Sequence, residues 1–144
     1  DALPDTGLQV LCLRSCAEDI ARSVLAKSPR LRSLAFVDSK LHENPGIMAS
    51  HLTSLSLSGI ATLVDEEFSR LVGNCQNLRS LYISKCHINH ITVALPQLEL
   101  LSVTHCRQLT DQCASELLQP LNNPRLRFVD FSECRSLTSP IVDH

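Results

Sequence analysis

The chain has 144 residues, of which 44% are hydrophobic, 19% are charged and only 3% are aromatic. Thirteen Lys and Arg residues against fifteen Asp and Glu residues give a net charge of −2, which excludes the strongly basic surface that drives nonspecific nucleic-acid binding. The longest uncharged run, residues 44–64, contains Pro45, Gly46 and several Ser and Thr residues, which excludes it as a membrane-spanning helix.

One pattern of apolar residues occurs six times along the chain. Each copy has an apolar residue, two free positions, a second apolar residue, one free position, a third apolar residue, two free positions and then a special position. The copies start at residues 8, 31, 52, 78, 98 and 126, which are 23, 21, 26, 20 and 28 residues apart. Steps of this size are typical of leucine-rich repeats. The four positions of each copy are Leu8, Leu11, Leu13 and Cys16; Leu31, Leu34, Phe36 and Ser39; Leu52, Leu55, Leu57 and Ile60; Leu78, Leu81, Ile83 and Cys86; Leu98, Leu101, Val103 and Cys106; and Leu126, Val129, Phe131 and Cys134.

Each copy predicts one short β-strand. The second and third apolar residues are two positions apart, so both side chains face the same side of a sheet. The rest of each copy must return the chain so that successive strands are parallel. About six such units predict an α/β fold, a curved leucine-rich-repeat solenoid with strands on the concave face and alternating helices and irregular segments on the convex face. We expect residues 1–144 to form a single domain, a fragment of a longer array, whose open ends a flanking domain or a partner covers.

Three return segments carry apolar residues at helical spacing, and we expect them to be helices. They are residues 17–27, 65–72 and 111–121. The apolar stripe of the third helix includes Leu121. We expect Thr62 and Asp65 to form a capping pair for the second helix, and Thr110 to be the N-cap of the third.

The two shorter return segments are expected to be irregular. Residues 42–51 contain Pro45-Gly46 and residues 89–97 contain Pro96. Proline removes a backbone donor and interrupts a helix, and glycine next to it favours a turn. The convex side is therefore predicted to have uneven thickness.

Cysteine occupies the special position in four of the six copies. These residues are Cys16, Cys86, Cys106 and Cys134, while Ser39 and Ile60 occupy the other two. The chain turns away from the strand at this point, where a small residue with a weak donor suits the carbonyl of the neighbouring turn. We expect the four thiols to form a structural ladder inside the solenoid. Because none of the seven cysteines is expected to pair, the compartment should be reducing, either cytoplasm or nucleus.

Two stretches of the chain resemble a known family. They are residues 74–86, Asn-Cys-Gln-Asn-Leu-Arg-Ser-Leu-Tyr-Ile-Ser-Lys-Cys, and residues 98–111, which end in Cys-Arg-Gln-Leu-Thr-Asp. Both resemble the cysteine-containing subclass of leucine-rich repeats in the substrate-recognition half of F-box proteins, and residues 135–138 echo the second stretch. The resemblance implies a protein–protein interaction module, with substrate recognition for an F-box ubiquitin ligase in the ubiquitin-like conjugation pathway. The chain has no Trp and no N-terminal three-helix pattern that an F-box would need.

Two other functions remain open for such repeats. The short, irregular steps are also similar to the repeat region of plant-type immune receptors or another sensor. A non-catalytic scaffold subunit of a larger complex would use the same fold.

The free positions of each copy point to the concave side, which is the usual binding face of a solenoid. Tyr and Arg are enriched among the residues that anchor protein interfaces. Tyr82 is the only Tyr in the chain, and the pattern aims it outward. We therefore expect a protein partner, with no nucleic acid and no membrane. The candidate partner-binding residues are Arg32, Arg79, Tyr82, Lys85, Leu100, His105, Arg127 and Phe128.

The sequence predicts no enzyme, cofactor or metal ion. Cys86, His87, His90, His105 and Cys106 are potential zinc ligands by type, but the pattern turns the two cysteines inward and His105 outward, and the chain has no Cys-x-x-Cys pair. A nucleophilic cysteine needs exposure and an activating neighbour. Of the remaining cysteines, Cys12 faces the concave side with no base placed beside it. Cys113 lies in the first turn of the third helix, a position that favours a lowered thiol pKa, but a residue on a convex-side helix is more often a packing group.

Overall fold

The computed structural model describes residues 7–47 and 51–138. Within these ranges, six strands form one open parallel sheet whose strand order follows the chain. The strands are β1 (Val10–Arg14), β2 (Ser33–Val37), β3 (Ser54–Ser58), β4 (Ser80–Ser84), β5 (Leu100–Thr104) and β6 (Phe128–Asp130). Their first residues pair with one another across the whole sheet, so the register advances by the same steps as the sequence copies. The predicted α/β class and parallel strands are confirmed.

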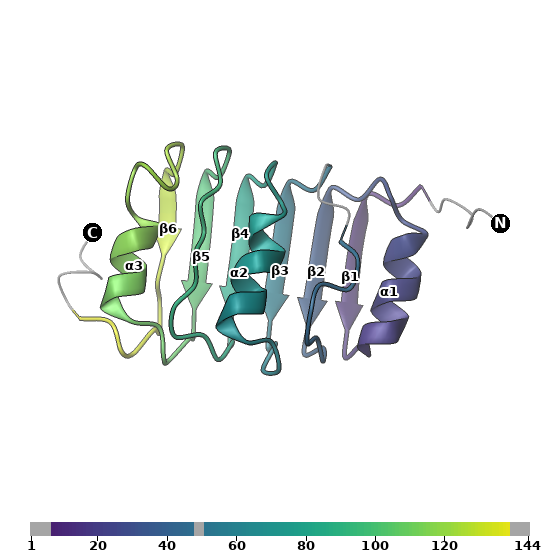
Figure 1. Cartoon of the computed structure of the whole chain (residues 1–144), viewed down its shortest axis with the longest axis horizontal. Coiled ribbons are helices and arrows are strands. Elements are labelled where there is room, and N and C mark those ends of the chain that lie inside the picture. Colours follow the sequence, from purple (N-terminus) through teal and green to yellow (C-terminus); the bar gives the residue numbers. More distant parts are fainter. Residues whose placement is uncertain (1–6, 48–50, 139–144) are drawn as a thin grey trace.

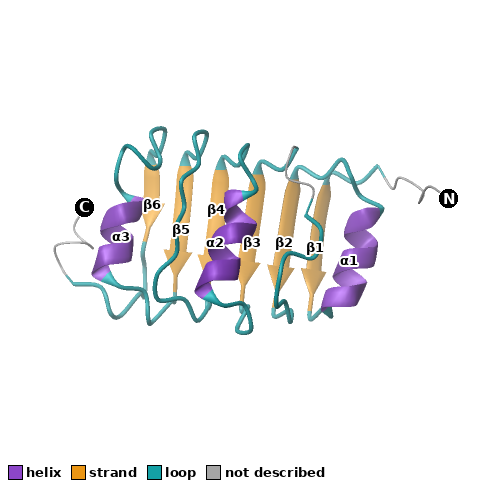
Figure 2. Ribbon diagram, viewed as in Figure 1, coloured by secondary structure: helices purple, strands orange, loops and turns teal. Residues whose placement is uncertain are grey.

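Helices cover one face of this sheet. They are α1 (Glu18–Ala26), α2 (Asp65–Gly73) and α3 (Asp111–Leu117), which follow β1, β3 and β5. The described parts of the return segments after β2 and β4 contain no helix, as predicted, and lie on the same side as the helices (Figure 2). Figure 1 shows α1 outside β1 and α3 outside β6, so the layer of helices is wider than the layer of strands. This arrangement indicates a sheet that curves away from its helices.

The hydrophobic core lies between the sheet and the return segments. The second and fourth residues of β2 to β5, such as Leu34 and Phe36, are buried, whereas the first, third and fifth are half-buried or exposed. Phe68 of α2 packs into the same core and is fully buried. Leu11 of the first strand and Phe131 after the last strand are only half-buried, because an end repeat has a neighbour on one side only.

The first residue of each helix is acidic and holds the next return segment in place. Glu18 accepts hydrogen bonds of 3.0 Å from the backbone N–H groups of His42 and Glu43. These bonds lower the pKa of the Glu18 carboxyl group. In the same way, a carboxylate oxygen of Asp111 accepts a 2.9 Å hydrogen bond from the backbone N–H of Thr138. Each helix is thereby tied to the following repeat as well as to its own.

The predicted capping pair of α2 is wrong. Val64 is the N-cap and makes no side-chain cap hydrogen bond. The Thr62 hydroxyl donates to the Leu41 carbonyl at 2.6 Å, in the preceding repeat. Asp65 accepts from the backbone N–H of Asn89, at 3.2 Å, and of His90, at 3.0 Å. Both side chains serve contacts between repeats, which a local capping rule does not consider.

The third helix is shorter than predicted. Its N-cap is Thr110, as expected, with the hydroxyl oxygen 3.2 Å from the backbone N of Cys113. The helix ends at Leu117, and Leu121 is 95% exposed, so it is not part of the buried stripe. The residue that precedes a proline disfavours helical geometry, and Pro120 follows shortly after the helix. Asparagine amides at positions 122 and 123 then bind the last helical carbonyls.

The residue directly after each of β1 to β5, and the equivalent residue of the last repeat, three positions after β6, have a left-handed backbone. The φ values of these residues lie between 50° and 69°. They are Ser15, Asp38, Gly59, Lys85, His105 and Glu133. Only glycine adopts this region without a cost of about 1 kcal/mol or more. The sharp turn is therefore a feature of every repeat, and Gly59 is the residue that adopts it with the least strain.

Replacing Gly59 with alanine is expected to lower the free energy of unfolding by about 1–2 kcal/mol. The φ of 69° strains an added side chain, and a Cβ at this position would overlap the Asp38 carboxylate. Urea denaturation followed by circular dichroism measures the loss. Gly73→Ala is the control, because a Cβ there meets no atom within 4 Å and the residue is helical. Equal midpoints for Gly59→Ala and the unmodified chain would contradict the prediction.

Candidate functional site

The face of the sheet opposite the helices carries the first, third and fifth side chains of each strand, and we call it the uncovered face. The pairing register aligns these residues in rows. The central row is Cys12, Ala35, Ser56, Tyr82, Ser102 and Asp130. The first row is Val10, Ser33, Ser54, Ser80, Leu100 and Phe128. Small residues dominate β2 and β3, whereas large side chains are concentrated on β4 to β6.

Three of the predicted binding residues meet on the uncovered face. Leu100 pairs directly with Phe128, and Tyr82 on β4 is diagonal to Leu100, two residues farther along the neighbouring strand. Long and aromatic side chains reach one another across such a diagonal. Tyr82 is 39% exposed and Phe128 is 56% exposed, while Leu100 is half-buried. We call these three residues the aromatic patch.

Three predicted arginines lie at the edge of the sheet where the strands begin. The same position before a strand holds Arg32, Arg79 and Arg127 in their repeats. Backbone hydrogen bonds connect this position from one repeat to the next, through Thr53 and Glu99 in the repeats between the arginines. Arg32 and Arg79 line a depression of about 260 Å³ together with Thr53 and His51. All three arginines are exposed. They therefore border the uncovered face along one edge.

The other two predicted residues, Lys85 and His105, lie at the opposite edge. They follow β4 and β5 directly, in the left-handed turn at the end of each strand. The turn rotates the chain away from the strand direction, an effect that the apolar spacing does not encode. Lys85 and His105 line a depression of about 540 Å³ that we call the basic pocket.

Sequence reasoning missed most of the basic pocket. Its other charged or imidazole side chains are His87, Arg107, Glu133 and Arg135. Arg107 and Arg135 come one residue after a ladder cysteine, and His87 follows Cys86 in the same way. The basic or imidazole residue directly after these three cysteines was the sequence signal from which the pocket could have been predicted. These residues belong to different repeats, so only the stacking of the turns brings them together.

Two of the ladder cysteines, and the serine at the equivalent position, bond to the preceding repeat. The Cys86 thiol lies 3.7 Å from the Leu57 carbonyl oxygen, and the Cys134 thiol lies 3.1 Å from that of Val103. The Ser39 hydroxyl occupies the equivalent place, 3.4 Å from the Leu13 carbonyl oxygen. In each case the acceptor is the third apolar residue of the preceding repeat.

Burial disfavours the thiolate form of the inner cysteines. It raises the pKa of Cys106 to about 12 and that of Cys75 to about 11. Cys16, on the end repeat, is half-buried, and its thiol is 3.3 Å from the Ala17 carbonyl oxygen. Cys12 is exposed in the central row of the uncovered face. All seven cysteines are free.

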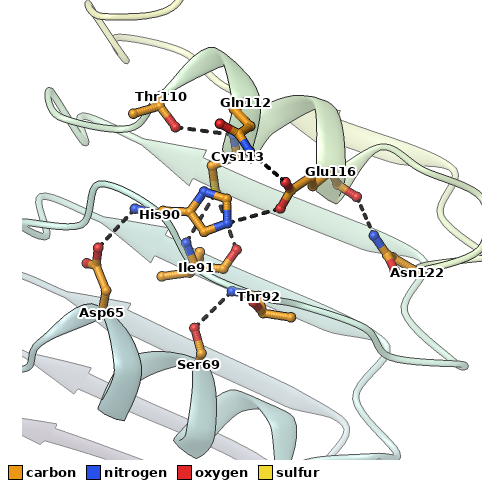
Figure 3. Close-up of polar contacts among 10 residues, drawn as sticks. All are labelled: Asp65, Ser69, His90, Ile91, Thr92, Thr110, Gln112, Cys113, Glu116 and Asn122. Carbon is orange, nitrogen blue, oxygen red and sulfur yellow. Dashed lines mark hydrogen bonds and ion pairs between the residues drawn. The ribbon is translucent and has the colours of Figure 1, made fainter.

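Burial raises the pKa of Cys113, as fits the packing role and not the activated thiol. Cys113 is fully buried, and its sulfur contacts the backbone of the facing return segment (Figure 3). It lies 3.2 Å from the nitrogen and 3.3 Å from the oxygen of Ile91. Desolvation outweighs the helix N-terminus here. The thiol is a packing group.

Figure 3 also shows how the irregular segment between β4 and β5 is held between two helices. On one side, the Ser69 hydroxyl of α2 accepts from the backbone N–H of Thr92 at 2.8 Å. On the other, His90 Nε2 lies 3.0 Å from a carboxylate oxygen of Glu116 on α3. The polar side chains of this cluster are already engaged with protein atoms. Although it has no helix, the segment between β4 and β5 thus connects the repeats on either side of it.

Across residues 7–47 and 51–138, no group of three or more His, Cys, Asp or Glu side chains is close enough to hold a metal ion. None of the described helices has the length and apolar character that crossing a membrane requires. No protein-family model matches the chain, and no curated protein is similar enough to count as a relative.

Proposed function

We propose that this chain is a leucine-rich-repeat solenoid that binds another protein through its uncovered face. Two features support the repeat family: the six-fold apolar pattern and the agreement between its steps and the strand register. The aromatic patch is the observation that carries the binding role. The partner is a protein, and neither nucleic acid nor membrane is part of the proposal.

The aromatic patch is not needed to build the sheet. At the same row positions, β2 and β3 carry Ser33, Ala35, Ser54 and Ser56, and the strands pair equally well. Exposed aromatic side chains that the fold does not require are typical of interaction surfaces. Arg79 and Arg127 at the adjacent edge supply the polar rim that surrounds such anchors.

The family resemblance supports a more specific role, which is substrate recognition for an F-box ubiquitin ligase. The resembling stretches, residues 74–86 and 98–111, contain β4 and β5, and these strands carry Tyr82 and Leu100. Seven free thiols favour a reducing compartment, cytoplasm or nucleus. The half-buried apolar residues of both end repeats favour coverage by a flanking domain or a partner.

Site-specific photo-crosslinking tests the binding face. A benzoylphenylalanine in place of Tyr82 is expected to form an adduct with one protein in cells, whereas the same residue in place of Ser115 is not. Ser115 is an exposed residue of α3, on the opposite side of the sheet, and serves as the matched position. Adducts of the same protein from both positions would contradict the proposal.

The captured partner is then purified and its affinity measured by calorimetry. Tyr82→Ala and Phe128→Ala are each expected to raise the Kd about thirtyfold, as truncation of an interface anchor does. Ser115→Ala should leave the Kd unchanged. Unaltered binding by both aromatic variants would remove the aromatic patch from the interface.

The ligase role has a separate readout. If the chain selects substrates for ubiquitination, the half-life of the captured partner should lengthen when the chain is depleted from cells and shorten again when it is restored. Phe128→Ala should fail to restore the short half-life. An unchanged half-life with intact binding would point instead to a scaffold.

A further inference from the structure

We propose that the basic pocket binds a phosphate monoester, supplied by a phosphorylated side chain of the protein that lies on the uncovered face. The source of the phosphate rests on the proposed function, whereas the anion chemistry rests on the pocket alone. Its lining side chains come from the turns after β4, β5 and β6.

The charge of the pocket matches a dianion. Lys85, Arg107 and Arg135 bring three positive charges against the single negative charge of Glu133, which leaves a net charge of +2 with neutral imidazoles. A phosphate monoester carries about −1.5 to −2 at neutral pH. Arg135 is paired with Glu133 only at 3.9 Å, and both groups are exposed. A ligand with a single carboxylate would neutralise only part of the net charge of +2, whereas a phosphate monoester matches it.

The donors of the pocket are available. Among the described residues, no hydrogen bond or ion pair involves the side chains of Lys85, His87, His105 or Arg107. The guanidinium group of Arg presents a planar fork of N–H donors that suits phosphate oxygens, and each imidazole has at least one N–H donor. The pocket therefore offers several donors around one depression of about 540 Å³.

The fold does not require these residues. The two turn positions that build the pocket occur in every repeat, and in the first three repeats they hold Ser15, Asp38 and Gly59 together with Ala17, Lys40 and Ala61. Small and acidic residues are thus compatible with the turn. The cationic cluster is confined to the last three repeats, which are also the repeats of the aromatic patch.

Location favours a protein as the source of the phosphate. Lys85 directly follows β4, the strand of Tyr82, and His105 directly follows β5, the strand of Leu100. The pocket lies at the opposite end of the strands from Leu100 and Phe128, so a partner that lies along β4 and β5 contacts both the aromatic patch and the pocket. A nucleic acid backbone needs a track of cations, since it carries one negative charge per about 1.7 Å. This chain has a net charge of −2, and the cations of the pocket surround one depression instead of forming a longer track.

Four small probes test the proposal on the isotope-labelled 144-residue chain by NMR. They are N-acetyl-phosphoserine methylamide, its unphosphorylated serine form, the glutamate equivalent and inorganic phosphate. We expect the phosphoserine probe to shift the backbone resonances of Lys85, His105 and Arg107, and the serine probe to shift none. Added salt should weaken binding, because the pocket is open to solvent.

Matched variants locate the site. Arg107→Gln is expected to raise the Kd of the phosphoserine probe about tenfold, the effect of losing a hydrogen bond to a charged group. Lys40→Gln removes a positive charge from the equivalent position of the second repeat and should leave the Kd unchanged. An unperturbed spectrum elsewhere confirms that each variant is folded.

The remaining outcomes overturn the proposal. No shift with phosphoserine, or an equal Kd for the glutamate probe, would exclude a phosphate-selective site. Binding of inorganic phosphate without binding of the phosphoserine probe would exclude a phosphorylated side chain as the source. These probes need no partner, so a failed crosslink at Tyr82 contradicts the proposed function and leaves the pocket result standing.

Discussion

Phe68→Ala is expected to lower the free energy of unfolding by about 4 kcal/mol, the range found for a phenylalanine truncated in a core. Phe68 lies in the middle of α2 and has no exposed surface. It belongs to the same core as Leu55 and Leu81 of the neighbouring strands. Removing the ring takes away its buried area and leaves a cavity that the stacked repeats on both sides do not fill. Urea denaturation followed by circular dichroism measures the loss.

Phe128→Ala is the matched control for this prediction. The chemical change is identical, but Phe128 is 56% exposed on the uncovered face. We expect a loss of less than about 1 kcal/mol, because little apolar area is returned to water. If both variants destabilised the chain equally, the assignment of the two faces would be wrong. A stable Phe128→Ala variant also makes the binding experiments interpretable.

Asn123→Ala is expected to lower the free energy of unfolding by about 3 kcal/mol, since several buried polar groups lose their partner at once. Asn123 is 3% exposed. Its amide donates to the carbonyls of Val93, at 2.8 Å, and Leu117, at 3.0 Å. Its side-chain oxygen accepts from the backbone N–H of Leu95 at 3.0 Å. One side chain thus closes the end of α3 and fixes the irregular segment before β5.

Two asparagines calibrate that loss. The side chain of Asn122 is half-buried and donates one hydrogen bond, 2.8 Å long, to the Glu116 carbonyl, so Asn122→Ala should cost about 1 kcal/mol. Asn89 is exposed, and Asn89→Ala should stay within about 0.5 kcal/mol of the unmodified chain. The same denaturation measurement ranks all three variants. A loss at position 123 no larger than that at position 122 would refute the role assigned to Asn123.

The candidate site was only partly predictable. The alternation along β4 to β6 was enough to expect Tyr82, Leu100 and Phe128 on one face, because side chains of a strand alternate with a period of two. The same reasoning did not predict the turn with positive φ in which Lys85 and His105 lie. In five of the six repeats this turn position holds a residue other than glycine, so its residue type does not announce a positive φ.

The sequence by itself determined the strand register and the placement of the helices. Apolar residues at fixed spacing have one way to be buried together, so the six strands align in the order of the copies. Apolar stripes then distinguish the three helical returns from the two that proline interrupts.

Only the tertiary structure decided the contacts between repeats. The grouping of Lys85, Arg107 and Arg135 in one pocket depends on how successive turns stack. The raised pKa of Cys113 depends on the segment that packs against it, and the importance of Asn123 depends on two segments that it joins. The spacing of apolar residues predicts which side chains are buried. It does not record which polar groups meet when the repeats come together, because those partners are 20 or more residues apart along the chain.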